Sequence, residues 1–369
     1  MKIGFVGGGT GGHFYPLIAV AEVLKTQEPN IELFYFGPAP YDKNLLLQHN
    51  ITYIYCPAGK LRRYLSVENL LDTFRSFFGI FIAFGKLYQI YPDVIFSKGS
   101  YTSVPILLAA WALRIPIVIH ESDSKPGRAN AIAKHFARYI GIAYADAAQF
   151  FPAHKTALIG IPIRKEIGVI NNSPFESLGI PSNKPLIYVT GGSLGAERIN
   201  NIIMKSLTDL LPHYRIFHQV GEANVKEIQQ TAQALLVDSP LQQDYYVVGS
   251  VSATTVSELL DAATLIISRA GSTTLFEIAH HGKPSIVIPI PEEISHDQRT
   301  NAYAYARNGA ASVIEEKNLT IHLLISEIHS IISDRELYQK MSSAALSQSL
   351  PDAATKVANI LLSIGHEHE

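Results

Sequence analysis

Residues 6–16 read V-G-G-G-T-G-G-H-F-Y-P, a glycine-rich loop that follows an apolar run at residues 3–6 and opens into a helical pattern. Glycine leaves the backbone bare, so a ligand can approach it closely or a turn with positive φ can form. The N–H groups at a helix N-terminus bind anions or other polar ligands. His13 lies beside these groups and can transfer a proton, so the loop indicates an enzyme.

The same loop allows two other interpretations. It satisfies G-x-G-x-x-G at Gly7, Gly9 and Gly12, the pattern of dinucleotide-binding sites. The next expected strand, however, ends in F-G-P and offers no Asp or Glu to a ribose hydroxyl. The second alternative is a tight turn without a ligand, which does not account for the histidine.

Strand-like and helical patterns alternate almost throughout, which indicates βαβ units and parallel sheets covered on both faces. A length of 369 residues exceeds what one core usually carries, so we expect two domains with a turn-rich linker at residues 161–184. Two such domains make a cleft, and ligands bind at the carboxyl ends of the strands. The expected strands are residues 2–6, 31–36, 51–56, 93–96, 115–120, 139–142, 186–190, 215–218, 245–248, 265–268, 285–289 and 311–314.

Composition indicates a globular protein. Hydrophobic residues make up 47% and charged residues 17%, and the formal net charge of -2 gives no case for a nucleic-acid partner. The single cysteine, Cys56, excludes a disulfide framework and is expected to be a small buried residue. No secretory signal precedes the first strand and no segment reaches the length of a membrane span, so we expect a cytoplasmic protein.

An aromatic helical segment has two open interpretations. Phe74, Phe77, Phe78, Phe81 and Ile82 repeat at helical spacing on one face. Residues 60–86 carry five basic side chains and only two acidic ones. Such a helix suits the anionic cytoplasmic leaflet of a membrane, and it equally suits a core position on the sheet. Both interpretations can hold together, with one face buried and the other on lipid.

Two further glycine turns follow strands in the second half. Residues 190–195, T-G-G-S-L-G, are either a pyrophosphate-facing loop or a simple turn. Residues 269–274, R-A-G-S-T-T, precede a helix in which Thr274-x-x-Glu277 matches a capping box. The Glu277 carboxylate alternatively binds the two hydroxyls of a ribose.

The sequence predicts no metal site. No two aspartates are spaced as D-x-D, and the histidines lack a recognisable ligand spacing. The negative charge of a diphosphate leaving group would then have to be stabilised by helix N-termini and by a cation such as Arg164. The alternative for Arg164 is an exposed, solvated side chain, which is the more common environment of arginine.

Eight motifs taken together are far more specific than any one alone. They are G-G-T-G-G-H-F-Y-P (8–16), G-S-Y-T-S-V-P (99–105), I-P-I-V-I-H-E-S-D (115–123), P-G-R-A-N (126–130), G-I-P-I-R (160–164), T-G-G-S-L-G-A (190–196), S-R-A-G-S-T-T-L-F-E-I-A (268–279) and D-Q-R-T-N-A (297–302). In this order and spacing the chain resembles the MurG family of UDP-N-acetylglucosamine transferases, over nearly its whole length.

The resemblance implies an α/β GT-B fold with two Rossmann-like doubly wound domains facing a cleft. The implied domains are residues 1–163 for the acceptor and the membrane, 164–350 for the UDP-sugar, and a helix and tail at 351–369 that return to the first domain. The implied reaction is inverting, metal-independent transfer of GlcNAc from UDP-GlcNAc to the C4 hydroxyl of undecaprenyl-pyrophosphoryl-MurNAc-pentapeptide, from lipid I to lipid II. No cofactor is implied, and the implied location is peripheral, on the cytoplasmic side of the inner (plasma) membrane.

Residue roles follow from the same resemblance. The implied general base is His13, and Tyr101 and Asn130 would face the acceptor. Phe74, Phe77, Phe78 and Phe81 would form the membrane patch. The implied donor site is Thr10, Gly11, Gly12, Asp123, Arg164, Gly192, Ser193, Ser272, Thr273, Thr274, Glu277 and Gln298, with Glu277 on the ribose and Gln298 on the donor sugar.

The chain departs from the family pattern at several positions. The family's H-E-Q-N is His120-Glu121-Ser122-Asp123, so a carboxylate replaces an amide expected on the donor sugar. Ile161 replaces a polar residue, and Ser100 replaces a glycine. Two alternatives stay open: a transferase of the same fold with another UDP-sugar or lipid acceptor, and a UDP-GlcNAc 2-epimerase-like isomerase.

Overall fold

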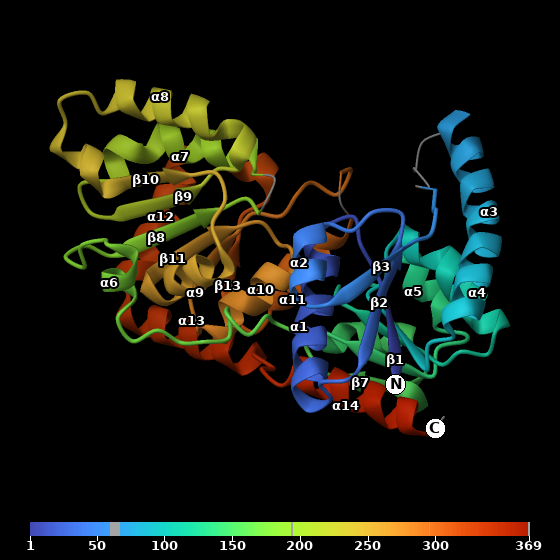
Figure 1. Cartoon of the computed structure of the whole chain (residues 1–369). Helices are drawn as coiled ribbons and strands as arrows, with labels where there is room; N and C mark the ends of the chain where they lie inside the picture. The colour runs from blue at the N-terminus through green and yellow to red at the C-terminus, as the bar shows by residue number, and fades with distance from the viewer. Residues whose placement is uncertain (60–66, 193–194, 295, 368–369) are drawn as a thin grey trace. The chain divides into compact units, whose positions relative to one another are not determined.

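The computed structural model describes residues 1–59, 67–192, 195–294 and 296–367. The chain forms two compact units, drawn as ribbons in Figure 1. The first unit spans Met1–Arg164 together with Leu350–Glu369, and the second spans Lys165–Ser349. Each unit has its own sheet and is described by itself.

The first unit is built on a parallel sheet with the strand order β3-β2-β1-β4-β5-β6-β7. Ile3 of the central β1 pairs with Leu33 of β2 on one side and with Val94 of β4 on the other. The chain therefore changes direction across the sheet between β1 and β4, the position at which such sheets bind ligands. The strands are β1 (Lys2–Val6), β2 (Glu32–Gly37), β3 (Ile51–Tyr55), β4 (Val94–Ser97), β5 (Ile117–Glu121), β6 (Tyr139–Ile142) and β7 (Thr156–Leu158).

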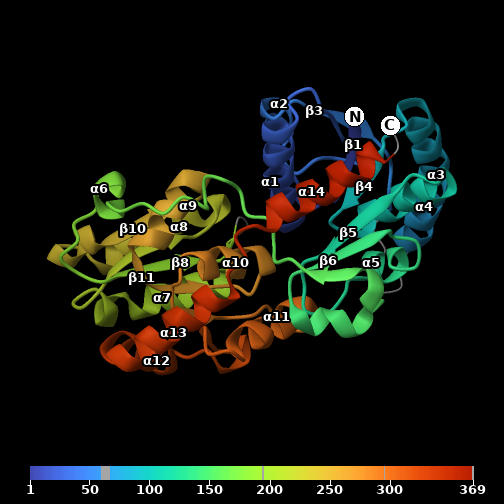
Figure 2. The same ribbon diagram turned by 90° about the horizontal axis from the view of Figure 1, so that it is seen from below.

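Helices cover both faces of this sheet. Side chains alternate along a strand, so Tyr35 packs in the core with α1, while Phe36 packs in the opposite core with α3 and α4. Helix α14, at the carboxy-terminal end of the chain, lies beside α1 (Figure 2). The helices of this unit are α1 (Gly11–Gln27), α2 (Lys43–Gln48), α3 (Val67–Ile90), α4 (Val104–Ala112), α5 (Arg128–Ala133) and α14 (Ala353–His366).

The second unit repeats this architecture. Its parallel sheet has the order β10-β9-β8-β11-β12-β13, with the change of direction between β8 and β11. The strands are β8 (Leu186–Thr190), β9 (Arg215–Gln219), β10 (Tyr245–Val248), β11 (Ala263–Ser268), β12 (Ser285–Val287) and β13 (Ala311–Val313). The helices are α6 (Pro174–Leu178), α7 (Glu197–Leu210), α8 (Val225–Leu235), α9 (Ala253–Ala262), α10 (Ser272–His280), α11 (His296–Ala306), α12 (Ile321–Ser333) and α13 (Arg335–Gln348).

The predicted alternation of strands and helices is confirmed, and each predicted strand overlaps a strand of the structure. The bounds differ by at most two residues; the strand expected at 115–120, for example, is Ile117–Glu121. One strand, β7, was not predicted, because its three residues T-A-L are too few to show a periodicity.

The linker predicted at residues 161–184 is wrong in its extent. The boundary between the units falls inside it, after Arg164, but its remainder belongs to the second unit. Ile167 is fully buried, and Pro174–Leu178 form α6. A turn-rich composition predicts changes of chain direction and does not distinguish a packed segment from a free one.

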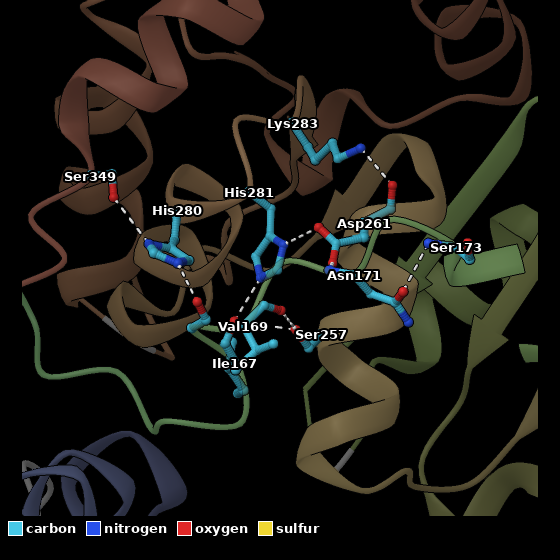
Figure 3. A network of polar contacts seen from close by, with 11 residues as sticks. Ile167, Val169, Asn171, Ser173, Ser257, Asp261, His280, His281, Lys283 and Ser349 are labelled. Atoms are coloured by element: carbon cyan, nitrogen blue, oxygen red, sulfur yellow. Dashed lines mark hydrogen bonds and ion pairs between the residues drawn. The ribbon is translucent and has the colours of Figure 1, made fainter. Parts of the chain in front are cut away.

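A polar network fastens the start of this segment to the second unit (Figure 3). Asp261, near the end of α9, accepts a hydrogen bond from the backbone N–H of Asn171 at 2.6 Å. Its other carboxylate oxygen lies 2.6 Å from Nδ1 of His281, which follows α10. Nε2 of His281 lies 2.8 Å from the carbonyl oxygen of Ile167. These contacts hold residues 167–171 against α9 and α10.

Helix α3 buries one face and exposes the other. Ala83 and Leu87 are buried one turn apart, and Gly79 precedes them on the same face. A Cβ at Gly79 would lie 2.2 Å from the carbonyl oxygen of Pro57, so only glycine allows this close approach. The four phenylalanines of the other face are between 55% and 62% exposed: Phe74, Phe77, Phe78 and Phe81. The core interpretation of the phenylalanine face is therefore wrong.

In the part of the chain that the structure describes, no helix has both the length and the apolar character needed to cross a bilayer.

Candidate active site

The candidate site of the first unit lies at the carboxyl ends of three neighbouring strands. Because β1, β4 and β5 are adjacent in the parallel sheet, their carboxyl ends meet at one edge. Residues 7–10 follow β1, residues 98–101 follow β4, and residues 122–127 follow β5. The glycine loop and the H-E-S-D motif, far apart in sequence, are thereby brought to the same edge.

The glycine loop is hydrogen-bonded to the core at Gly7, and its residues Thr10 and Gly12 are exposed. The Tyr35 hydroxyl donates to the carbonyl oxygen of Gly7. Gly9 has φ +93°, a conformation that side chains rarely adopt. Thr10 and Gly12 are exposed, and α1 begins at Gly11. The loop thus presents backbone groups at a helix N-terminus, the arrangement expected for a polar or anionic ligand.

His13 sits in the first turn of α1. Its Nδ1 lies 3.0 Å from Thr10 Oγ1. Burial lowers the pKa of His13 below its ordinary value; the nearby Asp123 carboxylate opposes this shift and the Lys98 ammonium adds to it. The imidazole is therefore neutral at pH 7. When Nδ1–H donates to Thr10, Nε2 carries the lone pair that can accept a proton.

A polar cluster centred on the buried Lys98 lies next to this loop, and Lys98 was missed in the sequence analysis. Lys98 follows β4 and is 2% exposed. Its Nζ lies 2.5 Å from His120 Nδ1 and also donates to Ser122 Oγ. His120 Nε2 lies 2.6 Å from the carbonyl oxygen of Gly160. The available signal was a lysine placed directly after an apolar strand, at the edge where ligands bind.

Glu121 organises the turn that follows β5. Its carboxylate accepts hydrogen bonds from the backbone N–H of Asp123 at 3.0 Å, the backbone N–H of Gly127 at 3.1 Å and the Asn130 side chain at 2.9 Å. Burial raises the pKa of Glu121 to about 7. Asp123, predicted at the donor, is half-buried in this turn.

Asn130 was predicted to face the acceptor, but the structure buries it. It is 2% exposed, and its Nδ2 donates to both the Glu121 carboxylate and the carbonyl oxygen of His120. Its Oδ1 is buried without a partner among the described residues. Asn130 thus supports the turn after β5, and its role toward the acceptor remains a prediction. Tyr101 is 37% exposed and begins a short 3-10 helix before α4.

Ser100 adopts a strained backbone conformation between β4 and this 3-10 helix. Its φ of 81° and ψ of 153° lie in a region occupied almost only by glycine. Such a conformation costs roughly 1–3 kcal/mol in a residue with a side chain. The serine in place of the family's glycine is therefore a stability defect at the edge of the site.

Replacing Ser100 by glycine is expected to raise the free energy of unfolding by about 1 kcal/mol, because relief of strain exceeds the added entropy of the unfolded chain. Denaturant unfolding measures this change. Asn50→Gly is the matched control, since Asn50 has φ 52° in the left-handed region that asparagine tolerates, and a smaller gain is expected there. An unchanged or lower midpoint for Ser100→Gly would show that the site is not strained.

Arg164 ends the first unit and stacks on an aromatic ring. Its guanidinium carbon lies 3.9 Å from the centroid of the Tyr15 ring. Its Nε is buried without a hydrogen-bond partner among the described residues. Tyr15 itself packs edge-on against Tyr41, with ring centroids 5.6 Å apart. The guanidinium is thus fixed beside α1 by stacking on Tyr15, an arrangement typical of arginine.

In the second unit, the loop after β8 is the first candidate nucleotide loop. The backbone N–H of Gly192 donates to Thr190 Oγ1 at 3.1 Å. Ser193 lies outside the described residues, so its predicted role remains a prediction. Helix α7 begins at Glu197, after this loop.

The second nucleotide loop leads from β11 into α10, and here the capping-box prediction is wrong. The N-cap of α10 is Gly271, so Thr274 already lies inside the helix and caps nothing. Ser272 begins the helix, and its hydroxyl accepts a hydrogen bond from Asn301 Nδ2 at 2.9 Å. Thr273, Thr274 and Glu277 are half-buried in the first two turns.

Gln298, on α11, holds this loop in place. Its Oε1 accepts hydrogen bonds from the backbone N–H of Ala270 at 3.2 Å and of Ile290 at 3.3 Å. It thereby joins the ends of β11 and β12. Its amide nitrogen is left as the group that can donate to a ligand.

The described residues contain no group of three His, Cys, Asp or Glu side chains placed to hold a metal ion.

Comparison with known proteins gives consistent matches over both units. Residues 3–142 match the glycosyltransferase family 28 N-terminal domain, and residues 186–357 match the glycosyltransferase family 28 C-terminal domain. A Bacillus cereus protein named UDP-N-acetylglucosamine--N-acetylmuramyl-(pentapeptide) pyrophosphoryl-undecaprenol N-acetylglucosamine transferase 2 is 36% identical, over 92% of this chain and 93% of its own length. The Treponema denticola transferase is 32% identical over 97% of this chain and 96% of its own.

Solved structures agree with these matches. The crystal structure of Acinetobacter baumannii MurG aligns with a TM-score of 0.77 at 26% identity, covering 98% of this chain and 99% of its own. The UDP-GlcNAc 2-epimerase from Neisseria meningitidis aligns with a TM-score of 0.69 at 16% identity, over 98% of this chain and 100% of its own. The second likeness shows a shared fold alone. The fold predicted from the sequence is confirmed.

Proposed function

Since the chain belongs to the MurG family of N-acetylglucosamine transferases, with both domains of glycosyltransferase family 28, we propose that it converts lipid I to lipid II. It moves GlcNAc from UDP-GlcNAc to the C4 hydroxyl of undecaprenyl-pyrophosphoryl-MurNAc-pentapeptide. The observation that supports this most directly is His13, a neutral imidazole oriented by Thr10 beside an exposed glycine loop.

The proposed reaction is a single displacement. The C4 hydroxyl oxygen attacks C1 of the GlcNAc, and the bond between C1 and the diphosphate oxygen breaks with UDP taking the electron pair. The hydroxyl proton passes to Nε2 of His13, which acts as general base. Attack opposite the leaving group inverts the configuration at C1.

The leaving diphosphate gathers negative charge as that bond breaks. We assign its stabilisation to Arg164, held by Tyr15, and to the backbone N–H groups at the start of α1 near Gly11 and Gly12. The loop after β8, with Gly192 and Ser193, is also assigned to the diphosphate. Fixed donors of this kind need no reorganisation during the reaction.

The nucleotide is assigned to the start of α10. Ser272, Thr273 and Thr274 would contact it, and Glu277 would accept hydrogen bonds from the two ribose hydroxyls. Glu277 lies one turn after Thr273 and Thr274, so the three side chains share a face of the helix. Gln298 would donate to the donor sugar, and Asp123 and Tyr101 would contact the sugars from the first unit.

The phenylalanine face of α3 is assigned to the membrane. Its four exposed phenylalanines lie next to a sequence region rich in basic residues. Apolar rings enter the acyl boundary while basic side chains meet anionic headgroups. The acceptor carries a lipid tail, so docking on the cytoplasmic side of the plasma membrane would bring the enzyme to its substrate as a peripheral protein.

The test is an assay of UDP release from UDP-GlcNAc, with and without a synthetic polyprenyl-pyrophosphoryl-muramyl-pentapeptide acceptor. Release is expected only when both substrates are present, and a disaccharide product should form in equal amount. UDP-glucose and UDP-GalNAc serve as donor controls, since Asp123 stands where the family has an amide. Conversion of UDP-GlcNAc to its 2-epimer without acceptor would identify an isomerase instead.

A further inference from the structure

Lys98 is a buried cation that the proposed reaction does not yet use. It is 2% exposed, and burying an ammonium costs several kcal/mol unless charge and hydrogen bonds compensate it. Burial lowers the pKa of Lys98 to about 7, while the carboxylates of Glu121 and Asp123 act in the opposite direction. The contacts of Lys98 must therefore compensate the free-energy cost of its burial.

The contacts of Lys98 and Gly160 determine which tautomer His120 adopts. The carbonyl oxygen of Gly160 only accepts, so His120 Nε2, 2.6 Å away, carries the ring hydrogen. His120 Nδ1 then holds a lone pair and accepts from Lys98 Nζ at 2.5 Å. The pKa of His120 lies well below its ordinary value because of burial and the Lys98 charge, so this ring stays neutral.

Lys98 also joins two loops of the site. Its Nζ donates to Ser122, in the turn after β5 that contains Asp123. Its stem runs against the glycine loop, since a Cβ built on Gly7 would lie 3.0 Å from the Lys98 Cβ. The glycine loop leads directly to His13. One side chain therefore contacts both the loop that carries the candidate base and the turn that carries the acidic pair.

The charges around His13 come from all three strand ends. The β1 end contributes His13 itself, the β4 end contributes Lys98, and the β5 end contributes Glu121 and Asp123. Asp123 stabilises the protonated form of His13, and Lys98 stabilises the neutral form. A general base must be neutral to accept a proton, so the ammonium and the carboxylate act on it with opposite sign.

We propose that Lys98 is a positioning residue of the transfer reaction: it joins the glycine loop to the turn after β5, and its ammonium offsets the charge of Asp123 beside His13. This inference rests on the proposed function for its catalytic consequence. The electrostatic coupling itself is a property of the folded protein without substrate. It goes beyond the roles given by the motifs, because it assigns a function to a residue outside them.

The test is an NMR titration of the His13 Cε1 resonance in the substrate-free protein. Lys98→Met keeps the length of the side chain and removes its charge, so the pKa of His13 should rise by roughly half a unit or more. Lys155→Met is the matched control: Lys155 donates to the carbonyl oxygen of Ala137 in the same unit, just before β7, and its loss should leave His13 unchanged. An unchanged His13 pKa in folded Lys98→Met overturns the proposal.

Asp123→Asn is the second variant of this titration, and it should shift the pKa of His13 in the direction opposite to Lys98→Met. It should lower the pKa of His13, and Lys98→Met/Asp123→Asn should return it close to the wild-type value. Should Lys98→Met alone not fold, the double variant is compared with Asp123→Asn, and an equal pKa in those two proteins overturns the proposal.

The pH dependence of kcat/KM then tests the consequence for the reaction. The acid limb should move to higher pH in Lys98→Met by as much as the His13 pKa, a shift that a purely structural role would not produce. If the His13 pKa shifts but no variant or wild-type protein transfers GlcNAc, the proposed function fails and the coupling stands. If transfer occurs and the His13 pKa does not shift, the coupling alone fails.

Discussion

Replacing His13 by alanine should lower kcat by roughly 100- to 10,000-fold, the usual contribution of a positioned general base. The affinity for UDP should change little, because UDP is assigned to groups other than the His13 side chain. The histidine is neutral at pH 7 and its Nδ1 is engaged by Thr10, so its removal takes away the proton acceptor without removing a charge. Steady-state rates of UDP release at saturating donor and acceptor measure the effect.

Thr10→Val is the matched variant for this prediction. It leaves the imidazole in place and removes the hydroxyl 3.0 Å from Nδ1. A smaller loss, about tenfold, is expected, because the ring keeps its basicity and loses only its orientation. If His13→Ala turns over at a rate near that of the wild type, His13 is not the general base. Asp123 would then be the next candidate for that role.

The double substitution Phe78→Ser/Phe81→Ser should weaken association with anionic liposomes about 100-fold. Each ring is about 60% exposed, at 61% and 62%, so both can enter a bilayer without unfolding the helix. Burying a phenylalanine side chain contributes roughly 1.5–3 kcal/mol, and two of them account for an effect of this size. Liposome sedimentation at fixed lipid composition measures the partition coefficient.

Val237→Ser/Leu346→Ser is the control for lost apolar surface elsewhere. Those side chains are 68% and 53% exposed in the second unit, and liposome association should not change. Thermal unfolding of both double variants should stay near that of the wild type. Unchanged liposome binding by the phenylalanine variant would contradict the assignment, and a large loss of thermal stability would show that the rings support the fold.

The fold was predictable because its signals are local. Apolar runs of four to six residues followed by glycine turns recur in both halves, and the runs at 2–6, 139–142 and 186–190 coincide with β1, β6 and β8. A parallel strand buried on both faces reads as a continuous apolar run, which composition alone reveals. The short β7 was not predicted, because three residues show no periodicity. The packing of residues 165–184 in the second unit was not predicted either, because turn-forming residues occur in both buried and exposed segments.

The site was predictable only in part. The family to which the chain belongs is the one that the motifs resemble. The same motifs give His13, Glu277 and Gln298 as candidate site residues, and their roles remain predictions. The start of α10 at Ser272 could not be decided from Thr274 and Glu277, because a capping box and a helix interior share the same letters. The burial of Asn130 beneath the turn after β5 also depends on contacts with residues ten positions away.

The sequence by itself determined the two doubly wound sheets, the glycine loop with its histidine, and the family. Those features depend on residues close together in the chain, whose spacing limits the conformations available to it. Only the tertiary structure decided that the phenylalanine face of α3 is exposed, and that Lys98 lies against the glycine loop and beside His120 and Ser122. The Lys98 contacts arise where β1, β4 and β5 lie side by side. Burial and charge coupling depend on distance in space rather than on separation along the chain.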